Sequence, residues 1–286
     1  MQLTREILAP LSFFERLSLR AGRLANESPF LKSASQLFAT VVARPWMTLV
    51  SSARMHLVGL ETLAALKPEG GVLLASNHRS FFDMYMITTY LHRKTGLCRR
   101  LYFPVRSTFF YDNPLGLWVN LWMSGFAMFP PIFREGPKRP ATVAGLEFLA
   151  EVLKRPGSIV GIHPEGRRGK GPDPYELLPA EPGFGKVALL AKPVVVPVFV
   201  NGLGNSFLGE CWATLLRRKQ PIVMVFGAPV DLSSFADAAP DRLRSQVEVS
   251  RCVLAEIAKL AEVERRVRAG LERGLPSSEA IREAGA

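Results

Sequence analysis

Short apolar runs alternate with amphipathic stretches through the middle of the chain, and this pattern predicts strands and helices in turn. The expected strands cover residues 55–58, 72–76, 101–105, 127–129, 158–163, 194–200 and 222–226. Between them, helical periodicity is found near residues 81–92, 140–154 and 184–191. Such alternation favours an α/β fold with a central sheet, mostly parallel or mixed, flanked by helices.

Both ends of the chain carry helical patterns without strands. An amphipathic stretch at residues 11–24 precedes an apolar stretch at residues 37–50, which Arg44 and Pro45 interrupt. We expect a helical hairpin whose basic, apolar face lies in a lipid headgroup layer; packing of the same helices on the core is the alternative. Between residues 240 and 274 apolar residues fall three or four apart, which predicts one long amphipathic helix or two.

The predicted organisation therefore has three parts. They are membrane-associating helices (residues 1–54), an α/β domain (residues 55–235) and a C-terminal helical extension (residues 236–286).

Charge and hydropathy narrow the class of partner. The 286 residues include 48% hydrophobic residues and carry a net charge of +11, which implies an anionic partner such as a phospholipid surface, nucleic acid or an acidic carrier protein. The basic clusters at residues 99–100, 167–168 and 217–219 are scattered and lack interleaved aromatic residues, so nucleic acid is disfavoured.

The chain shows no secretory signal and no run of about 20 uninterrupted apolar residues. We therefore expect a peripheral or monotopic protein on the cytoplasmic face of a membrane. The three cysteines, Cys98, Cys211 and Cys252, are few and not spaced for a metal. This usage suits a reducing compartment and a mechanism without a thiol, metal or other cofactor.

Candidate chemistry begins where the predicted strand at residues 72–76 meets the next helix. His78 precedes Asp83 by five residues, and Ser80 is an expected N-cap. A carboxylate in the first helical turn can hold one nitrogen of the histidine and leave the other as a general base. A purely structural pair is the alternative, because a histidine near an aspartate is common.

Three later stretches favour the catalytic interpretation. One apolar segment ends at Arg134, a strand ends in a Pro-Glu-Gly-Arg turn at residues 164–168, and Pro197 interrupts an apolar strand. With the His-x4-Asp pair, these four motifs stand in the order found in the glycerolipid acyltransferase family, which the chain resembles over roughly residues 55–230.

This resemblance implies transfer of a fatty acyl group from a thioester, acyl-CoA or acyl-carrier protein, to a hydroxyl of a lysophospholipid such as 1-acylglycerol 3-phosphate, in phospholipid biosynthesis. It implies that His78 is the base and that Asp83 orients it. The residues implied to shape the acceptor site are Arg134, Glu165, Gly166 and Arg167. Guanidinium groups suit a phosphate, and a glycine lets the backbone approach closely.

One departure from the family pattern leaves the acceptor open. Many members carry a phosphate-binding lysine where this chain has Glu181, and Lys186 is the expected substitute. Glycerol 3-phosphate or another lysolipid is therefore an alternative acceptor. A non-enzymatic basic protein that binds membranes or nucleic acid is the rival class.

Other residues near the motifs receive plainer interpretations. Asn77 is expected to form a turn, and His163 is interpreted as a packing residue in a position usually aromatic or aliphatic. Backbone N–H groups after Ser80 are expected to hold the oxyanion. Residues 115–129, with 109–111, are a candidate wall for an acyl slot, and an ordinary core helix is the alternative.

Overall fold

The fold is known from a computed structural model that describes residues 1–95, 97, 100–206, 209 and 220–285. The expectations for Cys98, Cys211 and the basic residues at 99 and 217–219 lie outside these residues. Arg100 and the free thiol of Cys252 lie within them.

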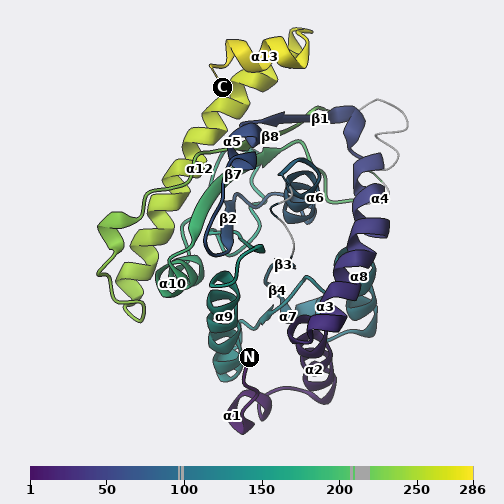
Figure 1. The fold of residues 1–286 in the computed structure, drawn as a ribbon, viewed down its shortest axis with the longest axis vertical. Helices are drawn as coiled ribbons and strands as arrows, with labels where there is room; N and C mark the ends of the chain where they lie inside the picture. The colour runs from purple at the N-terminus through teal and green to yellow at the C-terminus, as the bar shows by residue number, and fades with distance from the viewer. Residues whose placement is uncertain (96, 98–99, 207–208, 210–219, 286) are drawn as a thin grey trace.

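A six-stranded sheet forms the centre of the molecule (Figure 1). Its strands, in spatial order, are β1 (Met55–Val58), β8 (Ile222–Phe226), β7 (Val194–Asn201), β2 (Val72–Ser76), β6 (Ser158–Ile162) and β3 (Arg100–Tyr102). β2 pairs in parallel with both β6 and β7, whereas β8 runs antiparallel to β7. The expected α/β fold with a mixed sheet is confirmed.

Helices cover both faces of this sheet. α9 (Arg139–Leu153), α10 (Pro182–Ala191) and α12 (Leu243–Glu272) pack along one side, while α6 (Asp83–Thr95) and α5 (Leu60–Ala64) pack on the other. The strands β2, β6 and β8 are buried at every position, as expected for strands covered on both faces. α12 belongs to this core, because Val249, Val253 and Ile257 are fully buried.

Beyond α12, Gly274 takes a positive φ of 84° and the chain turns into the short α13 (Ser277–Glu283). The C-terminal pattern therefore forms one long helix followed by a short one. Short 3-10 turns complete the chain at η2 (Ser52–Arg54), η3 (Gly136–Lys138) and η4 (Ser233–Phe235).

The N-terminal region is helical, as the sequence predicts. α1 (Arg5–Leu8) is followed by α2 (Phe13–Glu27), α3 (Pro29–Phe38), the π-helical turn η1 (Ala39–Ala43) and α4 (Arg44–Leu49). Ser12 and Glu15 form a capping box at the start of α2. Ser28 both ends α2 and caps α3, so a single residue separates these two helices.

The structure corrects two of the strand predictions. Residues 101–105 form not one strand but β3 and then β4 (Val105–Arg106), because Pro104 between them has no N–H to donate. Residues 127–129 form no strand; the strand there is β5 (Pro131–Ile132), which pairs with β4. Between these segments lie α7 (Ser107–Phe110) and α8 (Pro114–Ser124).

The start of α6 is also corrected. α6 begins at Asp83, three residues after the expected N-cap Ser80. The Ser80 hydroxyl instead accepts from the N–H of Phe82 and donates to the carbonyl of Gly204.

A close contact between α10 and α12 gives a test of the packing. A Cβ added at Gly185 would lie 1.9 Å from the carbonyl oxygen of Gln246, so Gly185→Ala must push the two helices apart. We expect a loss of about 3 kcal/mol in the free energy of unfolding, because overpacking outweighs the gain in helix propensity. Chemical denaturation measures this loss.

Gly183→Ala is the matched control in the same helix. Its added Cβ would meet nothing closer than Leu146 at 3.7 Å, so this variant should be at least as stable as the wild type. Equal stability of the two variants would contradict the α10–α12 packing.

Candidate active site

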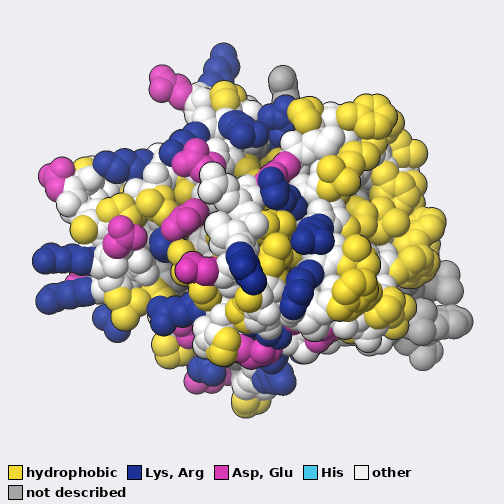
Figure 2. Space-filling model, turned by 90° about the horizontal axis from the view of Figure 1, so that it is seen from below, with side chains coloured by type: hydrophobic (Ala, Val, Ile, Leu, Met, Phe, Trp, Pro, Cys, Tyr) yellow, Lys and Arg dark blue, Asp and Glu magenta, His cyan; other side chains and the backbone are white. Residues whose placement is uncertain are grey.

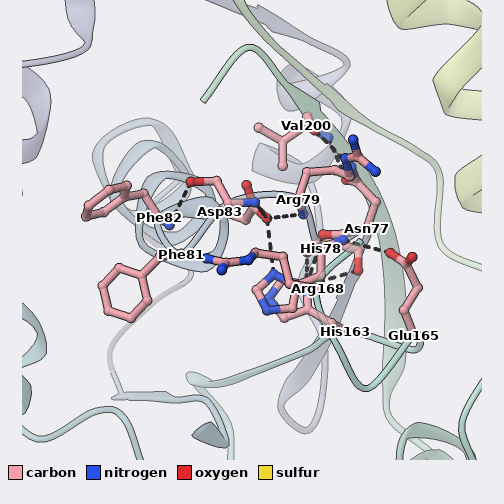
Figure 3. A network of polar contacts seen from close by, with 12 residues as sticks. Asn77, His78, Arg79, Phe81, Phe82, Asp83, His163, Glu165, Arg168 and Val200 are labelled. Carbon is pink, nitrogen blue, oxygen red and sulfur yellow. Dashed lines mark hydrogen bonds and ion pairs between the residues drawn. The ribbon is translucent and has the colours of Figure 1, made fainter. Parts of the chain in front are cut away.

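The chemistry-bearing residues meet where three parallel strands end at one edge of the sheet. Ala75 of β2 pairs with Ile162 of β6, and Ser76 pairs with Val198 of β7. The segments that leave these strands, residues 77–83, 163–168 and 202–205, therefore lie side by side (Figure 3). Open α/β sheets place their ligand sites at this edge.

His78 and Asp83 form the expected pair. Nδ1 of His78 lies 3.2 Å from Oδ2 of Asp83. The same oxygen accepts the backbone N–H groups of Arg79 and Ser80, each at 2.7 Å. Because Nδ1 faces the carboxylate, it carries the proton and Nε2 is left with its lone pair.

Burial sets the proton affinities of this pair. Burial, helped by the Arg168 guanidinium, lowers the pKa of His78 to about 4. Burial also raises the pKa of the Asp83 carboxyl to about 6, against the lowering effects of His163, of the bonded N–H groups and of Arg168. Such a coupled pair binds its protons as a unit, and His78 is neutral at neutral pH, as a general base requires.

Glu165 holds the backbone around the pair. Its Oε1 accepts the N–H of His78 and its Oε2 accepts the N–H of Leu178, both at 2.7 Å. Burial raises the pKa of this carboxyl, and the two N–H groups act against that. Glu165 thus fixes His78 from behind and ties the segment after the Pro-Glu-Gly turn to the same point.

Arg134 and Gly166 meet at that turn. Gly166 has a positive φ of 61°, which favours glycine, and its carbonyl accepts from Arg134 at 2.9 Å. An added Cβ there would lie 2.7 Å from the side chain of Glu181. Glu181 therefore packs beside the turn.

The two arginines of the turn differ in their surroundings. Arg167 is exposed, whereas Arg168 bonds Asn205 at 2.7 Å and its charge lowers the pKa of both His78 and Asp83. Figure 3 shows Arg168 beside His78. The sequence-based set omitted Arg168; the spacing of the Pro-Glu-Gly-x-Arg turn, which ends at residue 168, was the signal for it.

Lys186 lies in α10, where it bonds Glu147 at 3.4 Å and pairs with Asp241 at 3.8 Å. These partners belong to α9 and to the segment before α12. Among the described residues, no contact brings Lys186 to His78 or to the arginines of the turn, so its role toward a phosphate stays a prediction.

The expected oxyanion donors are already engaged. The N–H of Phe81 donates to Asn205 Oδ1 at 3.1 Å, that of Phe82 to the Ser80 hydroxyl, and that of Asp83 to the Ser80 carbonyl. These groups are not free to hold an oxyanion. Asn205 comes from the loop after β7, which reaches the site only through the fold. The role of the later N–H groups at the start of α6 stays a prediction.

Asn77 has a structural role, but it bridges two strands and does not form the turn that was expected. Its buried amide donates to the carbonyl of Val200 at 2.9 Å and accepts the N–H of Val200 at 2.8 Å. These bonds extend the pairing of β2 and β7 past the last residue of β2.

An Asp-held histidine thus lies beside Arg168 at the carboxyl edge of an α/β sheet, an arrangement that suits acid–base chemistry. A family model described as Acyltransferase matches residues 54–201, more than half of the 286 residues. The chain belongs to the acyltransferase family.

Other comparisons add less. No curated protein matches the chain. Among solved structures, the chain is similar to the 1-acyl-sn-glycerophosphate (LPA) acyltransferase PlsC from Thermotoga maritima, at 17% identity and a TM-score of 0.44, over 87% of this chain and 89% of that one.

The influence of Arg168 on the pair can be tested by pH dependence. Arg168→Gln removes a positive charge that lowers the pKa of both His78 and Asp83. Both pKa values should rise, so the pair is protonated at higher pH and the acid limb of kcat moves to higher pH. Steady-state rates of acyl transfer across the acid range measure this shift.

Arg167→Gln is the matched control, since it removes the same charge from the exposed neighbour. Its acid limb should stay where the wild type has it, whatever happens to KM. A limb that moves equally in both variants would contradict the assignment to Arg168.

Proposed function

We propose that this protein transfers a fatty acyl group from a thioester donor, acyl-CoA or acyl-carrier protein, to a hydroxyl of a lysophospholipid such as 1-acylglycerol 3-phosphate, in phospholipid biosynthesis. The observation that carries this proposal is the His78–Asp83 pair, at 3.2 Å, beside Arg168, with Arg134 bonded to Gly166 of the adjacent turn. A neutral base next to guanidinium groups suits a substrate with a hydroxyl and a phosphate.

In this reaction Nε2 of His78 takes the proton of the acceptor hydroxyl as its oxygen attacks the thioester carbonyl. The new carbon–oxygen bond forms, the carbon–sulfur bond breaks, and the thiolate leaves and recovers the proton. Asp83 stabilises the imidazolium in between. The substrates must be held together at near-attack distance for this direct transfer.

Ser80 supports transfer without an acyl-enzyme. Its hydroxyl is bonded to the carbonyl of Gly204 and to the N–H of Phe82, and it is fully buried. A serine nucleophile needs an exposed Oγ bonded to its base.

The acceptor phosphate would lie between the arginines of the turn and Arg134. The Arg167 side chain is exposed, and among the described residues no partner occupies its guanidinium group. Arg134 donates one hydrogen bond to the carbonyl of Gly166, and Arg168 donates one to Asn205 Oδ1. Each guanidinium group has further N–H donors that could bind a phosphate.

An aromatic path leads away from His78 and suits the acyl chain. The ring of Phe81 stacks on Phe110 at 5.6 Å, and Phe110 contacts Phe109 at 5.1 Å. Phe109 has a strained positive φ of 80° and is 40% exposed. Each methylene that such a surface covers contributes about 0.8 kcal/mol.

The N-terminal hairpin and α8 would bind the membrane. Large apolar side chains are exposed on α2, from α3 through α4, at Phe109 of α7, and on α8. Phe38 of α3 contacts Trp122 of α8 at 5.5 Å, which joins the surfaces of these two helices. We call this surface the apolar face; its members are Phe13, Leu17, Leu24, Phe30, Leu31, Leu37, Val41, Val42, Trp46, Leu49, Phe109, Leu115, Trp118, Leu121 and Trp122.

Basic side chains accompany the apolar face. Figure 2 shows hydrophobic side chains gathered on the side of these helices, with Lys and Arg side chains next to them. Arg16 and Arg20 of α2 are exposed. Such an arrangement fits a protein that lies on an anionic lipid surface. Within the described ranges, no helix has the length and apolar character needed to cross a bilayer.

The activity is tested by incubating purified protein with labelled acyl-CoA or acyl-carrier protein and a panel of lysolipids and glycerol 3-phosphate. Mass spectrometry identifies the product. We expect His78→Ala to lower kcat by about 10³-fold, the contribution typical of a general base. Substantial transfer by folded His78→Ala protein would end the proposal.

His92→Ala is the matched control on the same helix, α6, and should transfer at the wild-type rate. No product from any acceptor with the wild-type protein would refute the enzymatic function itself and favour the non-enzymatic class.

Membrane binding is tested by sedimentation with vesicles that contain anionic phospholipid. Phe30→Ser and Trp118→Ser each remove a side chain that is more than half exposed on the apolar face, at 79% and 57%. Each should weaken binding about tenfold, for a loss of about 1.4 kcal/mol. Added salt should weaken wild-type binding as well.

Leu243→Ser provides the control, because Leu243 is 60% exposed on α12 and lies outside the apolar face. Its binding should match the wild type. If all three variants bound equally well, the apolar face would not be the membrane contact.

A further inference from the structure

His163 stacks directly on the catalytic histidine. The two imidazole rings lie 3.9 Å apart between centroids and 6° from parallel. His163 follows β6 by one residue, so the register of β6 with β2 sets it beside Ser76, two residues before His78. In Figure 3 the two rings overlap.

The backbone of the catalytic loop fixes the ring of His163. Its Nδ1 lies 3.1 Å from the carbonyl oxygen of Ser76, 3.0 Å from that of Asn77 and 3.0 Å from the Ser76 hydroxyl. Carbonyl oxygens only accept, so Nδ1 carries the proton and donates it. A ring held in this way cannot turn without breaking bonds to the residues just before His78.

His163 is not a second base. Its Nδ1 is committed to the carbonyls, and burial, together with the adjacent His78, lowers its pKa to about 3. At neutral pH a flat, uncharged ring therefore covers one face of His78. By contrast, a single bond of 3.2 Å to Asp83 holds the far side of the His78 ring.

We propose that His163 is a positioning residue for His78: its anchored ring is the flat surface that keeps the His78 imidazole in the plane where Nδ1 meets Asp83 and Nε2 meets the substrate. This inference rests on the proposed function, in which His78 is the base. It goes beyond the sequence-based interpretation of His163 as a packing residue, because it assigns the ring an effect on turnover.

Two substitutions distinguish the effect of the His163 ring from the effect of its hydrogen-bond donor. His163→Phe keeps a flat ring but cannot donate to the carbonyls of Ser76 and Asn77. His163→Asn keeps a donor near the Nδ1 position but has no ring. The first should keep most of kcat with a lowered Tm, because two carbonyls lose their donor. The second should keep Tm and lose roughly 10- to 100-fold in kcat with KM unchanged, because the base is misplaced.

The supporting result is this crossed order, with Phe above Asn in kcat and Asn above Phe in Tm. A kcat that follows Tm, equal kcat values in the two variants, or a change confined to KM would overturn the proposal. These readings compare the two folded variants with each other and with the wild type.

A second measurement is independent of turnover. Nitrogen chemical shifts of the histidine rings report the tautomer of His78, identified by the signals missing from His78→Ala. Wild type and His163→Phe should show His78 protonated at Nδ1, and His163→Asn should show mixed tautomers. An unchanged tautomer in His163→Asn would overturn the role of His163, whereas absence of acyl transfer in the wild type would overturn only the proposed function.

Discussion

The parallel pairing of β2 with β6 on one side and β7 on the other is the constraint on which the site depends. Parallel strands end at a common edge, so the three segments that follow them must meet there, although up to about 120 residues separate them along the chain. Asn77 extends this pairing by bonding both backbone groups of Val200. The backbone pairing of the sheet thus fixes the position of His78, independently of the side-chain contacts within the site.

Two buried carboxylates, those of Asp83 and Glu165, then fix the orientation of the loop that carries His78. Asp83 and Glu165 are each 1% exposed, and burying a charge is costly unless hydrogen bonds compensate. Here the compensation comes from backbone N–H groups: Asp83 accepts those of Arg79 and Ser80, and Glu165 accepts those of His78 and Leu178. The loop that carries His78 cannot shift without exposing or orphaning one of these carboxylates, so the bonds that offset burial also immobilise the base.

Local pattern was enough to predict most of the strands and the catalytic pair. Apolar runs such as residues 72–76 and 194–200 can be recognised from neighbouring residues alone. The catalytic pair is equally local, because Asp83 follows His78 by five positions. Predictions failed where a distant segment decides. The N–H of Phe81, which was expected to help hold an oxyanion, donates to Asn205 Oδ1. Nothing in the local sequence around Phe81 predicts that contact.

The same distinction applies to the charged residues. Arg167 and Arg168 are neighbours with the same side chain. The spacing of the turn motif indicates the second one, and the fold shows that this residue lies beside the catalytic pair. Lys186 has the right charge for a phosphate, but it already pairs with Glu147 of α9 and with Asp241 of the segment before α12. Helix α8 was considered as a slot wall or a core helix. Its large side chains Leu115 and Trp118 point outward, which excludes an ordinary core helix, and Trp122 contacts Phe38 of α3.

This outward orientation joins the two halves of the proposed function. Phe81 is next to the catalytic loop and stacks on Phe110 of α7, and Phe109 beside it belongs to the apolar face. A strained φ at Phe109 is maintained because Gly116 of α8 packs against its carbonyl, where a Cβ would come within 1.6 Å. Under the proposed function, a lipid on the apolar face would meet the rings of Phe109, Phe110 and Phe81 on its way to the catalytic loop. Its acyl tail would keep contact with apolar side chains while its hydroxyl approached Nε2 of His78, so less apolar surface would face water during the reaction.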